Sequence, residues 1–326
     1  MHFKLLGRSG VYVSELCFGT MSFGGDADVA ESTRMFKAAR DAGINFFDCA
    51  DSYSGGEAER ILGKLIAGDR DQLVITSKCA MSTSDDVNDH GVSRRHIRNA
   101  VDASLKRLDT DRLDILLTHR WSPVTPLEET LRALEDLVRE GKVLYTGASN
   151  YAAWQVQKAL GISAQHAWTR FEVIQPMYNL VKRQAEVEIL PMAASEQLGV
   201  MTYGPVGGGL LSGKYASGTK PESGRLVDNE DYSARYDEKW VYKTAGRFSK
   251  FAKQKGIHPV SLAVAWVRAN SLVTCPIIGA RNLEQLYPSL DALNIEMNPE
   301  LYEQVSALSK EPALATDRLE EKTGLR

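Results

Sequence analysis

The chain has 326 residues, a mass of 36.0 kDa and a formal net charge of −3 at pH 7. Its 43% hydrophobic and 25% charged residues are typical of a folded globular protein and argue against a disordered, fibrous or membrane-spanning chain. The near-neutral balance also argues against a nucleic-acid or acidic-membrane partner, so neither kind of partner is expected.

The first predicted element is a β-hairpin over residues 3–16 that turns around Arg8–Gly10. We expect this hairpin to cover the bottom of the domain that follows. Short, nearly continuous apolar runs then succeed one another, as expected of strands buried on both faces. These runs begin near Leu16, Asn45, Leu73, Leu113, Val143, Phe171, Gly199 and Val273.

Segments with helical spacing lie between most of these runs. Residues 31–43 place Met35, Phe36 and Ala39 on one stripe before Gly43, a predicted C-terminal cap. Residues 93–108 open with Ser93 as the predicted N-cap. A third helix is predicted within 125–142, where Thr125–Pro126 opens the segment and Gly141 ends it.

Eight strand–helix units of roughly 30 residues predict a (β/α)8 TIM barrel. An open doubly wound sheet is the alternative, but it calls for G-x-G-x-x-G after the first strand, and the chain has FGTMSFGGD there. Because no linker or composition break divides the chain, we expect a single barrel domain over residues 1–326. The polar, turn-rich stretch 216–240 predicts a long loop after strand seven, at the top of the barrel.

Polar residues follow the predicted strands at their C-terminal ends, where barrels of this kind carry their chemistry. A ring of such residues at one mouth favours an active site over solvated strand ends. In strand order they are Asp48, Asp51 and Tyr53, then Lys78, His119 and Arg120, Ser149 and Asn150, Gln175, Tyr203, and finally Gly279 and Arg281.

Four of these residues suit the reduction of a carbonyl group. A tyrosine has an unperturbed pKa of about 10, and a nearby ammonium is expected to lower it. Tyr53 would then act as the general acid, Lys78 would tune it, and Asp48 would keep the lysine charged and oriented. His119 would supply a hydrogen bond to the same carbonyl oxygen.

Neither the histidines nor the cysteines predict a metal site. The six histidines show no H-x-x-x-H spacing, and His90 and His96 are expected to be solvated. Cys17, Cys49, Cys79 and Cys275 lie far apart and predict free thiols in a reducing compartment. With no signal-peptide pattern and no long apolar run, the chain is expected to be cytoplasmic.

Several segments together resemble the aldo-keto reductase family, in the style of its bacterial NADPH-dependent members, over about the whole chain. They are NFFDCADSYSGGEAERILGKLI, VITSK, SLKRLDTDRLDILLTHRW, VIQPMYNL, GVMTYGPVGGGLLSGKY and PIIGARNLEQL. The resemblance implies a barrel that binds NADPH in an extended form without a Rossmann motif. It also implies Tyr53 as general acid, Lys78 and Asp48 as the residues that tune it, and His119 as the residue that orients the carbonyl.

The resemblance further implies a set of cofactor contacts. Ser149, Asn150 and Gln175 would bind the nicotinamide carboxamide, Tyr203 would stack on its ring, and Arg281 would meet the 2′-phosphate. The full expected set is Gly19, Thr20, Met21, Asp48, Ser149, Asn150, Gln175, Tyr203, Gly204, Pro205, Val206, Gly207, Gly209, Leu210, Lys214, Gly279, Arg281 and Gln285. Phe23 and Trp121 would border the substrate pocket.

The sequence departs from the family pattern at two places. Pro288 and Ser289 stand where relatives often have Glu-Asn, so the last helix is expected to be short or kinked near the adenosine. Gly204 and Gly208 replace larger polar residues, which favours a looser cofactor loop.

Three functions are compatible with these residues. The first is an NADPH-dependent reductase of aldehydes or ketones. The second is a nicotinamide-binding regulatory subunit with little turnover. The third is a Schiff-base lyase that uses Lys78, although this explains neither Tyr53 nor Arg281. Substrate identity, reaction direction and oligomeric state stay open at this point.

Overall fold

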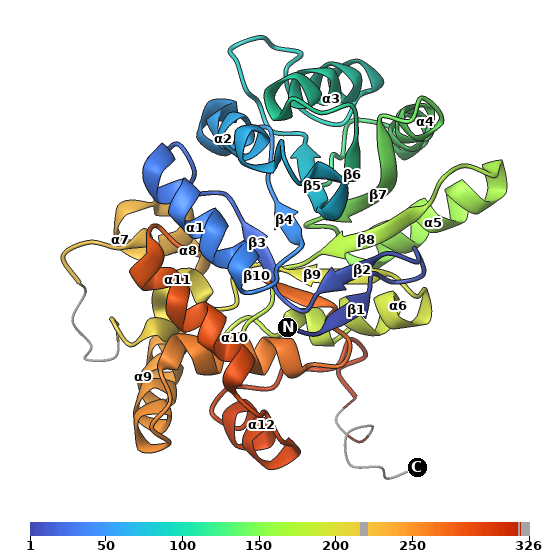
Figure 1. Ribbon diagram of the computed structural model, residues 1–326. Coiled ribbons are helices and arrows are strands. Elements are labelled where there is room, and N and C mark those ends of the chain that lie inside the picture. The colour runs from blue at the N-terminus through green and yellow to red at the C-terminus, as the bar shows by residue number, and fades with distance from the viewer. Residues whose placement is uncertain (216–220, 319, 321–326) are drawn as a thin grey trace.

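The computed structural model describes residues 1–215, 221–318 and 320, and its centre is a closed barrel of eight parallel strands (Figure 1). This confirms the predicted (β/α)8 barrel. Each strand lies within a few residues of a predicted apolar run. The strands are β3 (Cys17–Gly19), β4 (Phe46–Asp48), β5 (Val74–Cys79), β6 (Leu113–Thr118), β7 (Val143–Ser149), β8 (Phe171–Gln175), β9 (Gly199–Thr202) and β10 (Cys275–Ile278).

Helices surround the barrel, as Figure 1 shows. Ser93 caps α3 as predicted, because its side chain accepts a hydrogen bond from the main-chain N–H of His96. The first helix starts two residues before the predicted segment, since Asp28 caps it by accepting from the N–H of Glu31. The helices around the barrel are α1 (Val29–Asp41), α2 (Glu57–Ile66), α3 (Arg94–Leu108), α4 (Leu127–Arg139), α5 (Ala153–His166), α6 (Ile189–Ser195), α9 (Lys239–Gln254), α10 (Pro259–Ala269), α11 (Leu283–Leu290) and α12 (Pro299–Ser306).

The predicted N-terminal hairpin is present as β1 (Phe3–Leu5) and β2 (Tyr12–Ser14), which pair antiparallel. Leu6 is fully buried in a cluster with side chains from the barrel strands, so the hairpin packs against the bottom of the barrel. A Cβ on Gly199, the first residue of β9, would lie 2.6 Å from Leu6 Cδ1. Glycine at that position therefore lets the hairpin seat closely, and leaves the opposite end of the barrel as the mouth.

The long segment after β9 is not a plain loop. Residues 216–220 of the predicted loop lie outside the described residues, and the rest contains α7 (Arg225–Asp228), α8 (Glu230–Arg235) and the start of α9. Figure 1 shows α7 and α8 on the side of the barrel occupied by α1 and α11. Tyr232 of α8 reaches across to the loop after β3, with its hydroxyl 4.0 Å from Met21 Sδ. This segment therefore borders the mouth.

Candidate active site

The ammonium of Lys78 is the centre of the site. It donates to Asp48 Oδ2 at 2.7 Å, to the main-chain oxygen of Cys49 at 2.7 Å and to the hydroxyl of Tyr53 at 3.1 Å. Lys78 and Asp48 are both buried, at the C-terminal ends of β5 and β4. All three ammonium protons are thus engaged, and the lysine is fixed against the tyrosine.

A tight left-handed turn brings Tyr53 to this position. The residues after it, Ser54, Gly55 and Gly56, have φ values of 49°, 62° and 88°. Two of the three are glycines, which tolerate this backbone conformation without steric cost. The ring of Tyr53 then meets the ring of His119 edge-on, with centroids 6.1 Å apart.

The electrostatics of Tyr53 differ from the expected lowering of its pKa. Burial raises the pKa of Tyr53 to about 12, and the attraction of Lys78 offsets only part of that effect. Burial by itself would lower the pKa of Lys78, but the negative charge of Asp48 and contact with Tyr53 raise it above its ordinary value. At neutral pH the site therefore holds a protonated tyrosine beside a charged lysine.

His119 is neutral in this setting. Burial, followed by the positive charges of Lys78 and Arg120, lowers the pKa of His119 to about 3. Its Nδ1 is buried and makes no hydrogen bond to the described residues. A neutral imidazole carries one N–H, so it can orient a polar group by a hydrogen bond but cannot act as a cationic acid at neutral pH.

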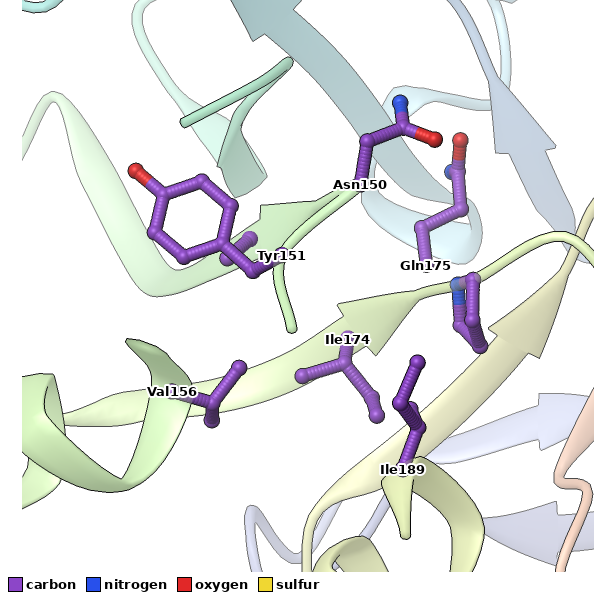
Figure 2. Close-up of a pocket in the computed structure, with 8 residues that line it drawn as sticks. Asn150, Tyr151, Val156, Ile174, Gln175 and Ile189 are labelled. Carbon is purple, nitrogen blue, oxygen red and sulfur yellow. The ribbon is translucent and has the colours of Figure 1, made fainter. Parts of the chain in front are cut away.

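A hydrogen-bonded chain runs from Asp48 to the ends of β7, β8 and β9. Gln175 Nε2 donates to Asp48 Oδ1 at 2.8 Å, and Ser149 Oγ donates to the main-chain oxygen of Gln175 at 3.0 Å. The hydroxyl of Tyr203 donates to Asn150 Oδ1 at 2.7 Å. Figure 2 shows the amide groups of Asn150 and Gln175 side by side at one end of a small cavity between β7, β8, α5 and α6. The structure thus brings four predicted cofactor residues together around Asp48.

The loop after β3 forms another side of the mouth. Thr20 Oγ1 donates to the main-chain oxygen of Asp48 at 3.0 Å, and Met21 is 42% exposed. A Cβ on Gly19 would lie 2.8 Å from Ile277 Cγ2, so this strand end approaches β10 closely. Gly279, directly after β10, is exposed at the same rim.

The glycine-rich run after β9 is folded as a series of left-handed turns. A short 3-10 helix spans Gly207–Ser212, and Gly204, Gly207 and Gly209 all have positive φ. A Cβ on Gly208 would lie 3.0 Å from side chains of both Leu226 and Tyr232, so α7 and α8 pack on this run. Of the other predicted cofactor residues here, Pro205 and Leu210 are buried, Val206 is half-buried and Lys214 is exposed.

Arg281 and Gln285 lie together at the start of α11. The main-chain N–H of Arg281 donates to Gln285 Oε1 at 3.3 Å, while Arg281 Nε lies 3.0 Å from Asp26 Oδ2. The sequence reasoning did not foresee this acidic partner. The helix predicted to be short or kinked is α11, which has eight residues, runs through Pro288 and ends at Leu290.

The two predicted pocket residues occupy different environments. Phe23 is fully buried against Phe18, with ring centroids 5.8 Å apart, so its ring belongs to the core and does not line an open pocket. Trp121 is half-buried and contacts Tyr151 and Trp154 edge-on, at 5.3 Å and 5.8 Å between ring centroids. Trp154 is 61% exposed and was missed by the sequence reasoning, because an aromatic residue at a helix start carries no distinctive pattern.

Sequence reasoning also missed a buried ion pair behind Tyr53. Arg107 Nε lies 2.6 Å from Glu59 Oε2, and Glu59 is fully buried. The sequence feature that could have predicted this pair is a glutamate on the apolar stripe of α2, next to Ala58, Ile61 and Leu62. A charged residue in such a stripe needs a buried partner.

The remaining polar predictions concern metals and thiols. Within residues 1–215, 221–318 and 320, no group of three or more His, Cys, Asp or Glu side chains is placed to hold a metal ion. The four cysteines are free and buried.

The expectation of a solvated His96 is wrong: its side chain is 2% exposed and its Nδ1 lies 3.4 Å from Asp89 Oδ1, because α3 faces the loop after β5. None of the described helices is both long enough and apolar enough to cross a membrane.

The chain is thus a (β/α)8 barrel that carries an Asp–Tyr–Lys–His set at its mouth, which is the arrangement expected of an aldo-keto reductase. The family model of the aldo/keto reductase family matches residues 15–310, and the chain belongs to this family. The chain is 36% identical to the uncharacterized oxidoreductase YrpG of Bacillus subtilis, with 96% of this chain and 97% of that one covered.

Two further relatives have names that indicate different functions, a channel subunit and a reductase. One is a probable voltage-gated potassium channel subunit beta of Oryza sativa subsp. japonica, 35% identical with 94% of this chain and 96% of that one covered. The other is a norsolorinic acid reductase of Aspergillus flavus, 33% identical with 92% and 78% covered. Both enzymes and channel subunits are therefore among the proteins that this chain resembles.

Proposed function

We propose that the protein is an NADPH-dependent oxidoreductase that reduces a small aldehyde or ketone to the alcohol, with Tyr53 as the general acid. The observation that carries this proposal is the triple engagement of Lys78 Nζ with Asp48, Cys49 and Tyr53. This arrangement places a charged donor 3.1 Å from the one hydroxyl that would give up a proton.

The residues at the mouth fit a nicotinamide dinucleotide phosphate. NADPH, when bound, supplies a hydride for the carbonyl carbon. The amide and hydroxyl groups of Ser149, Asn150 and Gln175 suit its carboxamide, and Tyr203 suits stacking on its ring. The positive-φ glycines of the 204–213 run let the backbone approach a pyrophosphate closely. Arg281, which pairs with Asp26 in this structure, would supply a cation for a 2′-phosphate, a group that a guanidinium binds well.

The chain's own groups account for the proton side of the reduction. Tyr53 donates its hydroxyl proton to the carbonyl oxygen, and the O–H bond of the tyrosine breaks as that of the alcohol forms. The phenolate left behind accepts a hydrogen bond from Lys78, which Asp48 keeps charged. His119, neutral and next to Tyr53, donates an N–H to the same carbonyl oxygen and so orients it.

The family relationship also favours a second candidate, a nicotinamide-binding regulatory subunit with little turnover. Relatives named as potassium channel beta subunits match nearly the full chain. The intact Asp48, Tyr53, Lys78 and His119 set supports the reductase over this alternative.

A Schiff-base lyase is not supported. Such an enzyme needs an uncharged amine as nucleophile. The Lys78 ammonium has its three protons engaged, and Asp48 holds its pKa above the ordinary value against the opposing effect of burial.

The reductase proposal is tested by following NADPH consumption against a panel of aldehydes and ketones, with NADH as the control cofactor. We expect turnover of at least part of the panel, faster with NADPH than with NADH. Tight NADPH binding without oxidation on any carbonyl would instead support the regulatory subunit.

A further inference from the structure

A buried charged cluster lies behind the turn that carries Tyr53. Glu59 of α2 accepts hydrogen bonds from Arg107 Nε at 2.6 Å and from Ser77 Oγ at 2.5 Å. Arg107 also donates to Ser104 Oγ at 3.2 Å. The Glu59–Arg107 pair therefore joins α2 to α3. Through Ser77, the residue directly before Lys78, it also joins α2 to β5.

The side chain of Arg107 also packs on the Tyr53 turn itself. A Cβ on Gly56, which ends this turn, would lie 2.8 Å from Arg107 Cδ and 2.9 Å from its Nε. The arginine stem thus lies against the backbone of the turn. Because a close-packed interior transmits displacements between neighbouring groups, the position of Arg107 helps to set the position of Tyr53.

Asp51 brings a second carboxyl group under the influence of the Arg107 guanidinium. It is 1% exposed, and its main-chain N–H donates to the main-chain oxygen of Lys78 at 3.1 Å. Neither of its carboxyl oxygens accepts a hydrogen bond of ordinary geometry from the described residues. A buried carboxylate without a partner is costly, whereas a protonated carboxyl is not, so this environment favours the protonated form.

Charged groups from three elements surround the Asp51 carboxyl. Burial and then the negative charge of Glu59 raise the pKa of Asp51 to about 7, and Arg107 opposes them. The groups whose charge or dipole acts on it are Glu59 of α2, Arg107 of α3, Asp89 of the loop between β5 and α3, the Cys79 thiol of β5 and the main-chain N–H of Ser52. The Lys78 ammonium donates no hydrogen bond to Asp51, because it donates its three hydrogen bonds to Asp48, Cys49 and Tyr53.

Resting on the proposed reductase function, we propose that Asp51, Glu59 and Arg107 form a positioning cluster for Tyr53 and Lys78, which holds the catalytic geometry only while Asp51 carries a proton. Arg107 balances the charge of Glu59. When Asp51 is ionised, its carboxylate competes with Glu59 for the Arg107 guanidinium. The Arg107 side chain then moves away from its position against the backbone of Gly56. The cluster acts through Tyr53 and Lys78 and is not itself in contact with the carbonyl.

The pH profile of turnover tests this cluster. We expect kcat of the wild type to fall roughly threefold to tenfold between about pH 6 and about pH 8.5, with KM for the carbonyl little changed. Asp51→Asn, which keeps the shape of the protonated acid, should remove this fall. Asp114→Asn is the control, because Asp114 pairs with Arg70 at the start of β6, away from the mouth, and should keep the fall. An undiminished fall in Asp51→Asn, or no fall in the wild type, would overturn the proposal.

Arg107→Lys provides a second variant. It keeps the positive charge but lacks the planar fork, so kcat should drop about tenfold at constant KM. Unchanged kcat in a folded variant would contradict the cluster. If Arg107→Lys does not fold, Glu59→Gln takes its place, with the same expected drop and the same contradicting result.

A measurement without substrate separates this inference from the reductase proposal. If the wild type reduces no carbonyl, the proposed function fails, and the pH dependence of unfolding still decides whether Asp51 carries a proton in the folded protein. A loss of stability between about pH 5 and about pH 7 that is larger in the wild type than in Asp51→Asn supports a protonated Asp51. Equal pH dependence in the two proteins rules it out.

Discussion

Gln175 Nε2 donates to one oxygen of the Asp48 carboxylate at 2.8 Å, while Lys78 Nζ donates to the other at 2.7 Å. The two donors come from β8 and β5, which are not neighbours in the barrel. Asp48 therefore links a proposed nicotinamide contact to the proposed catalytic lysine. Because each oxygen of the carboxylate accepts a hydrogen bond, the orientation of the Asp48 side chain is fixed.

This link predicts that Gln175 matters for turnover as well as for cofactor binding. Gln175→Leu leaves Asp48 Oδ1 without its donor, so kcat should fall about tenfold to a hundredfold and NADPH should bind more weakly. Steady-state kinetics and fluorescence titration with NADPH measure the two effects. Gln157→Leu, at a surface amide that contacts Glu196, is the matched control and should change neither. A weaker NADPH affinity with unchanged kcat would break the proposed link.

His119 should remain neutral throughout the range in which the enzyme works. Burial and the charges of Lys78 and Arg120 hold its pKa at about 3, so protonation becomes appreciable only in strong acid. An NMR titration between about pH 5 and about pH 8 should show constant His119 resonances, assigned with His119→Gln. A titration midpoint inside that interval would contradict a neutral hydrogen-bond donor.

Arg281 should decide between the two nicotinamide cofactors. Arg281→Ala removes the cation expected at the 2′-phosphate, so KM for NADPH should rise about tenfold to a hundredfold while KM for NADH stays constant. Asp26→Asn removes the present acidic partner of Arg281 and should lower KM for NADPH. Arg98→Ala, in an exposed pair with Glu140, serves as control. An equal change in KM for NADPH and NADH would remove Arg281 from phosphate recognition.

The raised pKa of Asp51 predicts a pH-dependent stability of definite sign. Its folded pKa of about 7 lies above the value of about 3.9 for an unfolded chain. Between these values the folded state holds a proton that the unfolded state has lost, so the free energy of unfolding falls as pH rises to about 7 and then levels off. The loss is at most on the order of 4 kcal/mol. Chemical denaturation across this range should show a smaller pH dependence in Asp51→Asn, and an identical curve would contradict the assigned pKa.

The barrel could be predicted from the sequence because its strands are buried on both faces. Such strands appear as continuous apolar runs, and Leu113–Thr118 and Phe171–Gln175 were found almost to the residue. The proposed catalytic set followed from the same strands, since a barrel places the residues after each strand at one mouth. The contact of Lys78 with Asp48 is therefore implied by the pairing of β4 with β5, whereas the contact with Tyr53 also depends on the left-handed turn after β4.

Features that depend on tertiary packing could not be predicted. The burial of Phe23 depends on how the loop after β3 folds back on Phe18, and the pairing of Arg281 with Asp26 joins residues at opposite ends of the chain. The pKa of Tyr53 depends on whether burial or Lys78 has the larger effect, and only the structure shows that burial does. Asp51 was seen as one more polar residue at a strand end, because the charges that act on it, Glu59 and Arg107, come from two helices further along the chain.

The central claim is that Tyr53 donates the proton while Lys78 keeps the tyrosine in place, and Tyr53→Phe tests it most directly. The variant keeps the ring and removes only the hydroxyl, so NADPH affinity measured by fluorescence titration should stay within about twofold of the wild type. The kcat for the best carbonyl of the panel should fall about a hundredfold to ten-thousandfold. Wild-type turnover in Tyr53→Phe would contradict the proposed mechanism.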